Sequence, residues 1–138
     1  MDQVAASLNI TSCGLRLTVS RSTTIWVGAA DDLWKLGKPR GFGGPWKNTA
    51  VQKGTPSDPY LMTGYDKKTL KLTNHGAKPV RVSVLLDAAG DGRTSAYRTI
   101  EVAAGAEVTH AFESWLNAYW VRFVSDEDGI LSAQLTYE

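Results

Sequence analysis

Short apolar–polar alternations, separated by turn residues, run along most of this 138-residue chain. The segment Val80–Leu86, for example, has valine or leucine at every second position, which is the period of a half-buried strand. Turn-forming runs such as Asn74–Pro79 and Asp87–Gly92 recur about every 8–12 residues, and long amphipathic helices are absent from the pattern. The sequence therefore predicts an all-β fold, an antiparallel β-sandwich of jelly-roll type. Comparable alternating segments are residues 7–11, 15–20, 25–27, 70–74, 97–102, 107–112, 118–124 and 130–137.

One stretch departs from this pattern. Gly37–Pro59 has no sustained apolar period and is rich in glycine and proline. A loop of this length is uncommon within a compact domain and is usually functional or disordered. Aromatic side chains in and beside it argue against a disordered linker. We predict one long ordered loop over residues 37–59 in a single domain spanning 1–138. Only Asp31–Leu36 is expected to be helical, as at most one short turn capped by Asp31 or Asp32.

Composition and charge exclude several classes of function. A formal net charge of +1 argues against a nucleic-acid-binding protein, and no apolar run is long enough to predict a membrane span. Residues 31–68 hold seven basic and four acidic residues, so this part is mildly basic while the remainder is mildly acidic. We read this as ordinary surface charge or as a preference for an anionic ligand. The N-terminal residues do not resemble a signal peptide.

The aromatic residues of the loop region suggest carbohydrate binding. Flat tryptophan and tyrosine rings can stack on sugar rings, while neighbouring polar side chains hydrogen-bond to hydroxyl groups. The competing interpretation is that Trp34 and Trp46 fold the loop back onto the sandwich and are buried. We predict a non-catalytic module for a neutral or anionic glycan, with these candidate ligand contacts: Trp34, Arg40, Phe42, Trp46, Lys47, Tyr60 and Tyr65.

Two alternatives remain open from the sequence. The first is a small glycan-active enzyme, a hydrolase or lyase, because carboxylates, tyrosines and a lysine can act as acids and bases. Its candidate catalytic residues are Asp31, Asp32, Asp58, Tyr60, Tyr65 and Lys67. The second is a structural or oligomerisation module that presses the loop against a second copy or a partner domain. We lean away from an enzyme, because helix capping and turn formation also account for the aspartates.

Metal and cofactor sites have weak support. His75 and His110 are too far apart in sequence for a histidine-rich jelly-roll metal site, and Cys13 is the only cysteine. The run Asp87–Gly92 has part of a calcium-loop pattern but lacks its later ligands, so we predict no cofactor, with a structural calcium as the alternative. The glycines at 41, 43 and 44 do not form a phosphate-binding loop and are expected to allow tight turns or close backbone approach.

A second aromatic cluster lies at Trp115, Tyr119 and Trp120. The residues from Tyr119 to Val124 alternate between two faces of one expected strand. We expect one face to be core and favour burial of the other under the long loop, with exposure as a contact surface as the alternative.

Four segments together carry a family resemblance. They are LWKLGKPRGFGGPWKNTAV at 33–51, PSDPYLMTGYDKKTL at 56–70, AYWVRF at 118–123 and SAQLTYE at 132–138. Over about residues 25–138, the chain resembles the C-terminal β-sandwich portion of secreted bacterial glycan-associated proteins of propeller type, most of them uncharacterised. The resemblance implies an extracytoplasmic module related to a larger protein, and it assigns no catalytic residues.

Overall fold

The computed structural model describes residues 7–11, 14–19, 23–27, 35 and 37–138. The chain forms two compact units, Met1–Lys38 and Pro39–Glu138, which are described separately. The prediction of a single domain over residues 1–138 stays a prediction. Cys13, Asp31, Asp32 and Trp34 lie outside the described residues, as does most of the helical turn expected at 31–36.

The first unit contains one antiparallel three-stranded sheet in the order β1-β2-β3. Strand β1 spans Ser7–Thr11, β2 spans Gly14–Val19 and β3 spans Thr23–Val27. All three strands were predicted from the period-two alternation. We also expected them to join one sandwich with the later strands; they form a sheet of their own, and the two four-stranded sheets contain strands of the second unit alone.

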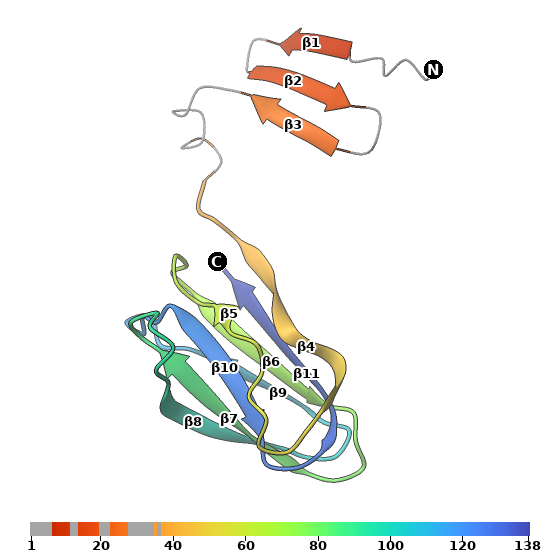
Figure 1. Ribbon diagram of the computed structural model, residues 1–138, viewed down its shortest axis with the longest axis vertical. Helices are drawn as coiled ribbons and strands as arrows, with labels where there is room; N and C mark the ends of the chain where they lie inside the picture. The colour runs from red at the N-terminus through yellow and green to blue at the C-terminus, as the bar shows by residue number, and fades with distance from the viewer. Residues whose placement is uncertain (1–6, 12–13, 20–22, 28–34, 36) are drawn as a thin grey trace. The chain divides into compact units, whose positions relative to one another are not determined.

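The second unit is an eight-stranded sandwich of two antiparallel sheets (Figure 1), in the orders β4-β11-β6-β9 and β5-β10-β7-β8. Its strands pair in a nested way, β4 with β11, β5 with β10, β6 with β9 and β7 with β8. Nested antiparallel pairs split between two sheets define a jelly roll, so the predicted fold is confirmed. The strands are β4 Gly41–Val51, β5 Tyr60–Leu61, β6 Lys68–Asn74, β7 Val80–Asp87, β8 Ser95–Val102, β9 Glu107–Ala111, β10 Trp120–Ser125 and β11 Gly129–Tyr137.

The core lies between the two sheets and consists mainly of every second side chain of β6, β7, β10 and β11. On β7, the valines at 80, 82 and 84 are almost fully buried, and on β10 Val121 and Phe123 are fully buried. Leu131, Ala133 and Leu135 of β11 face them from the other sheet. The alternation seen in the sequence therefore separates core from surface. None of the described residues forms a helix long and apolar enough to cross a membrane.

The prediction of a loop over 37–59 is wrong for residues 41–51, which form the edge strand β4. Its pairing with β11 shifts register twice, between Leu131 and Ala133 and between Ala133 and Leu135. Each shift is a β-bulge that adds one residue to β4, so the strand has no regular period of two. Because its sequence does not alternate, β4 could not be recognised as a strand from hydrophobic periodicity.

Side chains of β11 satisfy the backbone groups that these bulges leave unpaired. The backbone N–H of Asn48 donates to the Ser132 hydroxyl at 2.8 Å, and the Gln134 side-chain amide donates to the Trp46 carbonyl at 2.7 Å. Asn48 has a left-handed backbone with φ of 53°, which asparagine tolerates better than most residues. The bulges are thus supported features of the fold.

The remaining part of the predicted loop, residues 52–59, is ordered as we expected. It runs along β10, where the Ser57 N–H donates to the Phe123 carbonyl at 2.8 Å. In return the Phe123 N–H donates to the Ser57 hydroxyl at 3.0 Å, and Ser57 is buried. This connection fixes β5 beside β10 and so positions Tyr60.

Candidate functional site

A groove of about 390 Å³ lies at one end of the sandwich, where β4 and β5 form the edges of the two sheets. A volume of this size is near the lower end of the range for small-ligand pockets. Residues from β4, β5, β10 and β11 and from the segments flanking β5 meet in it. The lining residues are predominantly aromatic: Gly41, Phe42, Pro59, Tyr60, Leu61, Tyr65, Trp120 and Tyr137.

The inner wall of the groove is a fixed pair of tyrosines. The rings of Tyr65 and Tyr137 are stacked, with centroids 4.4 Å apart and an interplanar angle of 22°. Tyr137 is buried and its hydroxyl donates to the Leu61 carbonyl. Burial raises the pKa of the Tyr137 hydroxyl well above its usual value, and Tyr60 and Tyr65 add to this rise. Tyr137 therefore stays protonated, and its hydrogen bond to Leu61 connects β11 to β5.

Two glycines on β4 allow neighbouring groups to approach the strand closely, at Tyr60 and at β11. A Cβ atom at Gly43 would overlap the Tyr60 hydroxyl, and Gly43 has φ of 157°. A Cβ at Gly44 would overlap the backbone carbonyl of Ala133. The expectation that these glycines allow close approach is confirmed at both positions.

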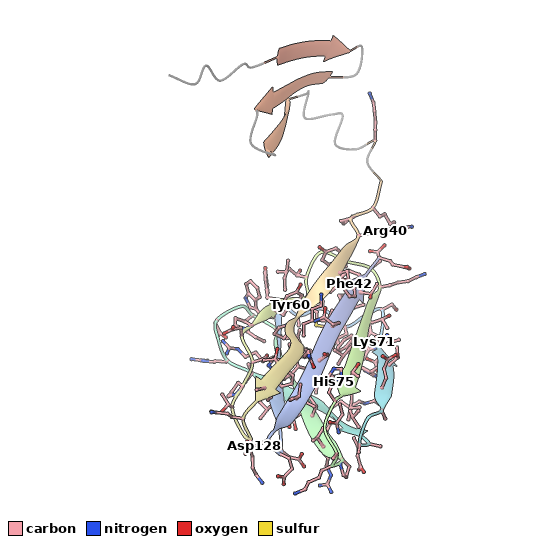
Figure 2. The ribbon with its side chains drawn as sticks, turned by 90° about the vertical axis from the view of Figure 1, so that its right-hand side faces the viewer. Arg40, Phe42, Tyr60, Lys71, His75 and Asp128 are labelled. Carbon is pink, nitrogen blue, oxygen red and sulfur yellow. The ribbon has the colours of Figure 1, made fainter. Side chains whose placement is uncertain are left out.

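The rim of the groove exposes apolar side chains to solvent. Phe42 is 71% exposed and Leu61 is 41% exposed, while Tyr60 and Trp120 are partly exposed. Trp120 pairs with Leu61 across β10 and β5, so the two side chains are neighbours on the outer face of that sheet. Figure 2 shows Phe42 and Tyr60 near the same end of the sandwich, with Asp128 at the opposite end.

Charged side chains flank the groove without lining it. Arg40 is exposed and precedes β4, close to Phe42 (Figure 2). Lys67 forms an ion pair with Glu138 at 4.0 Å, and both side chains are well exposed. Exposed pairs of this kind contribute little to stability.

The structure brings together three of the predicted ligand contacts: Phe42, Tyr60 and Tyr65 all line the groove. Trp46 is only 5% exposed and packs against Phe123, with ring centroids 5.9 Å apart. It belongs to the core and is excluded from the site, as its competing interpretation anticipated.

The other predicted ligand contacts do not line the groove. Arg40 lies beside it, and Lys47 is exposed further along β4, where its backbone N–H donates to the Thr49 hydroxyl at 3.0 Å. Trp34 lies outside the described residues.

The candidate catalytic residues do not form a carboxylate pair in this groove. Its lining, as the described residues define it, contains no aspartate or glutamate. Asp58 is exposed, and its backbone carbonyl accepts a hydrogen bond from the Ser57 hydroxyl at 2.9 Å. Lys67 is engaged with Glu138. Of the members of that set that the structure describes, only Tyr60 and Tyr65 line the groove, while Asp31 and Asp32 lie outside the described residues.

Sequence reasoning missed Trp120, Leu61, Pro59 and Tyr137 as lining residues. Trp120 belongs to the second aromatic cluster, together with Tyr119 on the strand whose two faces we expected to be buried. Tyr119 is 51% exposed, so the expectation is wrong for that ring. The signal that points to Trp120 is the strand alternation itself, since Val121 and Phe123 occupy the core face and place Trp120 on the other.

A cluster of polar side chains connects β8 and β9. The Tyr97 hydroxyl donates to the Glu113 carboxylate and lies 3.2 Å from His110 Nε2. Arg98 lies 3.3 Å from His110 Nδ1. Because an arginine can only donate, Nδ1 accepts and Nε2 carries the proton that it donates to Tyr97. The cluster is a directional hydrogen-bond chain from Arg98 to Glu113.

The ionisation of this chain follows from its geometry. Burial and the hydrogen bond to Glu113 raise the pKa of Tyr97 to about 12. The same hydrogen bond lowers the pKa of Glu113. Burial, aided by the Arg98 charge, lowers the pKa of His110. A neutral His110 and a hydrogen-bonded Tyr97 are consistent with a structural role, in which this chain of hydrogen bonds connects the edge strands β8 and β9.

The turn expected as a calcium alternative is organised by hydrogen bonds to the Asp87 carboxylate. One carboxylate oxygen accepts the Gly90 N–H at 2.7 Å and the other accepts the Gly92 N–H at 2.9 Å. Burial raises the pKa of Asp87, but the backbone amides of the turn outweigh it, so the pKa is lowered. Both oxygens already have partners, which leaves them poorly placed as calcium ligands. No group of three or more His, Cys, Asp or Glu that could hold a metal is found among the described residues.

His75 is close to a serine but is not arranged for catalysis. Its Nε2 lies 2.9 Å from the Ser132 hydroxyl. The same hydroxyl accepts the Asn48 N–H that supports the β4 bulge. Ser132 is therefore part of the strand pairing, and Figure 2 shows His75 well along the sheet from Tyr60.

Comparisons with known protein families, with curated proteins and with solved structures found no match to this chain.

Proposed function

We propose that the jelly-roll unit is a non-catalytic carbohydrate-binding module that binds a neutral or anionic glycan in the aromatic groove. One observation carries the proposal: the groove exposes Phe42, Tyr60 and Trp120, and its lining among the described residues contains no carboxylate. The apolar C–H face of a pyranose fits against such rings, while its hydroxyl edge stays in contact with water and with tyrosine hydroxyls.

Charge at the rim supports the anionic half of the proposal. Arg40 forms no hydrogen bond or ion pair with any residue that the structure describes, and it lies beside Phe42. An exposed guanidinium can pair with the carboxylate of a uronic acid in a bidentate way. The resemblance to secreted glycan-associated proteins agrees with this proposal and with an extracytoplasmic location.

Affinity electrophoresis tests the proposal directly. The full chain is run through native gels that contain xylan, mixed-linkage β-glucan, alginate or polygalacturonate, and retardation relative to a gel without polysaccharide is measured. We expect retardation by at least one polymer and its loss in Phe42→Ala and Trp120→Ala. Ile130→Ala is the matched control, because Ile130 is also exposed but lies at the far end of β11. Equal retardation of Phe42→Ala and the parent would contradict a site in this groove.

A partner-binding role is the second candidate, because Phe42 and Leu61 are exposed apolar residues on two edge strands. Edge strands can pair with other chains. The two bulges and Pro45 in β4 oppose such pairing, since they interrupt the row of backbone donors and acceptors. Light scattering after size exclusion separates the candidates: a dimer that Phe42→Ala converts to a monomer would favour the partner-binding role.

A further inference from the structure

The connection between β9 and β10 carries the most exposed large apolar side chain among the described residues. Trp115 is 75% exposed, and Tyr119 at the end of the same connection is 51% exposed. Large exposed aromatic residues usually mark a contact surface. The connection lies at the end of the sandwich that also holds the groove, because Trp120 follows directly and lines it.

The start of this connection is anchored to the sandwich. The Glu113 carboxylate accepts a hydrogen bond from the Tyr97 hydroxyl, and the Glu113 backbone carbonyl accepts one from the Leu116 N–H at 3.0 Å. Leu116 is buried on the core, and its carbonyl accepts the buried Lys68 ammonium group at 3.2 Å. Trp115 therefore sits on a short turn that is fixed on both sides.

The end of the connection is anchored as well. The Tyr119 N–H donates to the Asp87 carbonyl at 2.9 Å, and the Tyr119 carbonyl accepts the Met62 N–H at 2.9 Å. Its ring lies over Gly90, where an added Cβ would come within 3.3 Å of the ring. Tyr119 thus bridges the β7–β8 turn and the segment after β5, next to the Leu61 and Trp120 side of the groove.

From this arrangement we propose that Trp115 and Tyr119 form a second contact site which continues the groove, so that the ligand is a linear oligosaccharide of several units. The inference rests on the proposed function and deepens it. Each ring can stack on only one sugar unit, and the rings belong to different elements: Phe42 to β4, Tyr60 to β5, and Trp115 to the β9–β10 connection. A single monosaccharide in the groove would leave Trp115 exposed.

The anchoring supports this interpretation over incidental exposure. The backbone that carries Trp115 is held by the buried Leu116, the buried Lys68 and backbone hydrogen bonds, so this backbone loses little conformational freedom when a ligand binds. Preorganised aromatic residues are the usual dominant contacts of binding surfaces. An extended ligand therefore gains contact area on Trp115 at a small entropic cost.

The test measures how affinity depends on chain length. Titration calorimetry is performed with the full chain and with the di-, tetra- and hexasaccharides of whichever polysaccharide retards the parent. Trp115→Ala is expected to weaken hexasaccharide binding by about fivefold or more and to leave disaccharide binding within about twofold. Trp120→Ala is expected to weaken binding at every length. Trp115→Phe, which keeps a flat ring, should restore most of the hexasaccharide affinity, and Ile130→Ala is the control.

The outcomes separate this inference from the proposed function. If Trp120→Ala weakens binding but Trp115→Ala changes nothing at any length, the groove stands and the second contact site is overturned. An equal loss for disaccharide and hexasaccharide in Trp115→Ala also overturns it, since the ring would then belong to the primary site. If no polysaccharide retards the parent, the proposed function fails, and the inference fails with it.

Discussion

Truncation of two aromatic residues of β4 is expected to change the free energy of unfolding by very different amounts. Trp46 is 5% exposed and belongs to the core, whereas Phe42, four residues earlier, is 71% exposed. Truncation of Trp46 to alanine removes a ring that buries roughly 150–250 Å², worth about 4–6 kcal/mol at about 25 cal/mol per Å². Core Trp→Ala changes usually cost about 3–5 kcal/mol, so we take about 4 kcal/mol as the expected loss.

Phe42→Ala is the matched comparison. With less than a third of the side chain buried, the same arithmetic gives roughly 1–2 kcal/mol. Since domains of this size are stable by about 5–15 kcal/mol, Trp46→Ala should fold but lose a large share of its stability, while Phe42→Ala should stay close to the parent.

Urea denaturation of the full chain, followed by far-UV circular dichroism, measures both losses without relying on tryptophan fluorescence. For a slope near 2 kcal/mol per M, Trp46→Ala should lower the urea midpoint by about 2 M and Phe42→Ala by about 0.5–1 M. Trp46→Phe should fall between them. If Trp46→Ala cost less than about 1 kcal/mol, or if Phe42→Ala cost as much as Trp46→Ala, the assignment of the two rings to core and surface would be refuted.

Three further predictions concern stability at acid pH, stability at alkaline pH and the replacement of glycine by alanine. Because the pKa values of His110 and Glu113 are lowered in the folded state, the unfolded chain takes up protons first as the pH falls below about 6.5 and again below about 4.5. The melting temperature should therefore fall steadily from pH 7 to pH 4, and a flat or rising profile would contradict the hydrogen-bond chain.

At alkaline pH the sign reverses. The pKa of Tyr97 is raised to about 12, so the unfolded tyrosine ionises first near pH 10 and stability should be lost between pH 10 and pH 12. Tyr97→Phe should reduce that alkaline loss in parallel melts. Gly44→Ala should cost about 1–3 kcal/mol in urea because its methyl group would overlap a backbone carbonyl, whereas Gly129→Ala, with open space around it, should cost clearly less.

The regular strands and the fold class were predictable from the sequence because a single rule governs them. Where neither bulge nor insertion occurs, as on β6 and β10, alternation alone separates core from surface. Strand β5 has only two residues, which is too short for any periodicity to show. Its place beside β10 depends on hydrogen bonds from Ser57, which are tertiary contacts that a local pattern does not encode.

The candidate site was predictable only in part. Phe42, Tyr60 and Tyr65 were identified because aromatic residues in a glycine-rich segment need a surface or a core to contact. Trp120 and Tyr137 were missed because they come from strands far along the chain, and the jelly-roll pairing of β4 with β11 and β5 with β10 brings them to the groove.

The failure at Trp46 has a geometric cause. In a regular strand, Phe42 and Trp46 would share a face, since they are four residues apart. Across the sheet, however, they pair with Thr136 and Ala133, which are three residues apart and so face opposite sides. The bulge between them supplies the extra residue that reverses the face. One inserted residue at the glycine-rich start of β4 thus presents one aromatic ring to the groove and directs the next into the core, so the same bulge that hid the strand from sequence analysis also creates the candidate site.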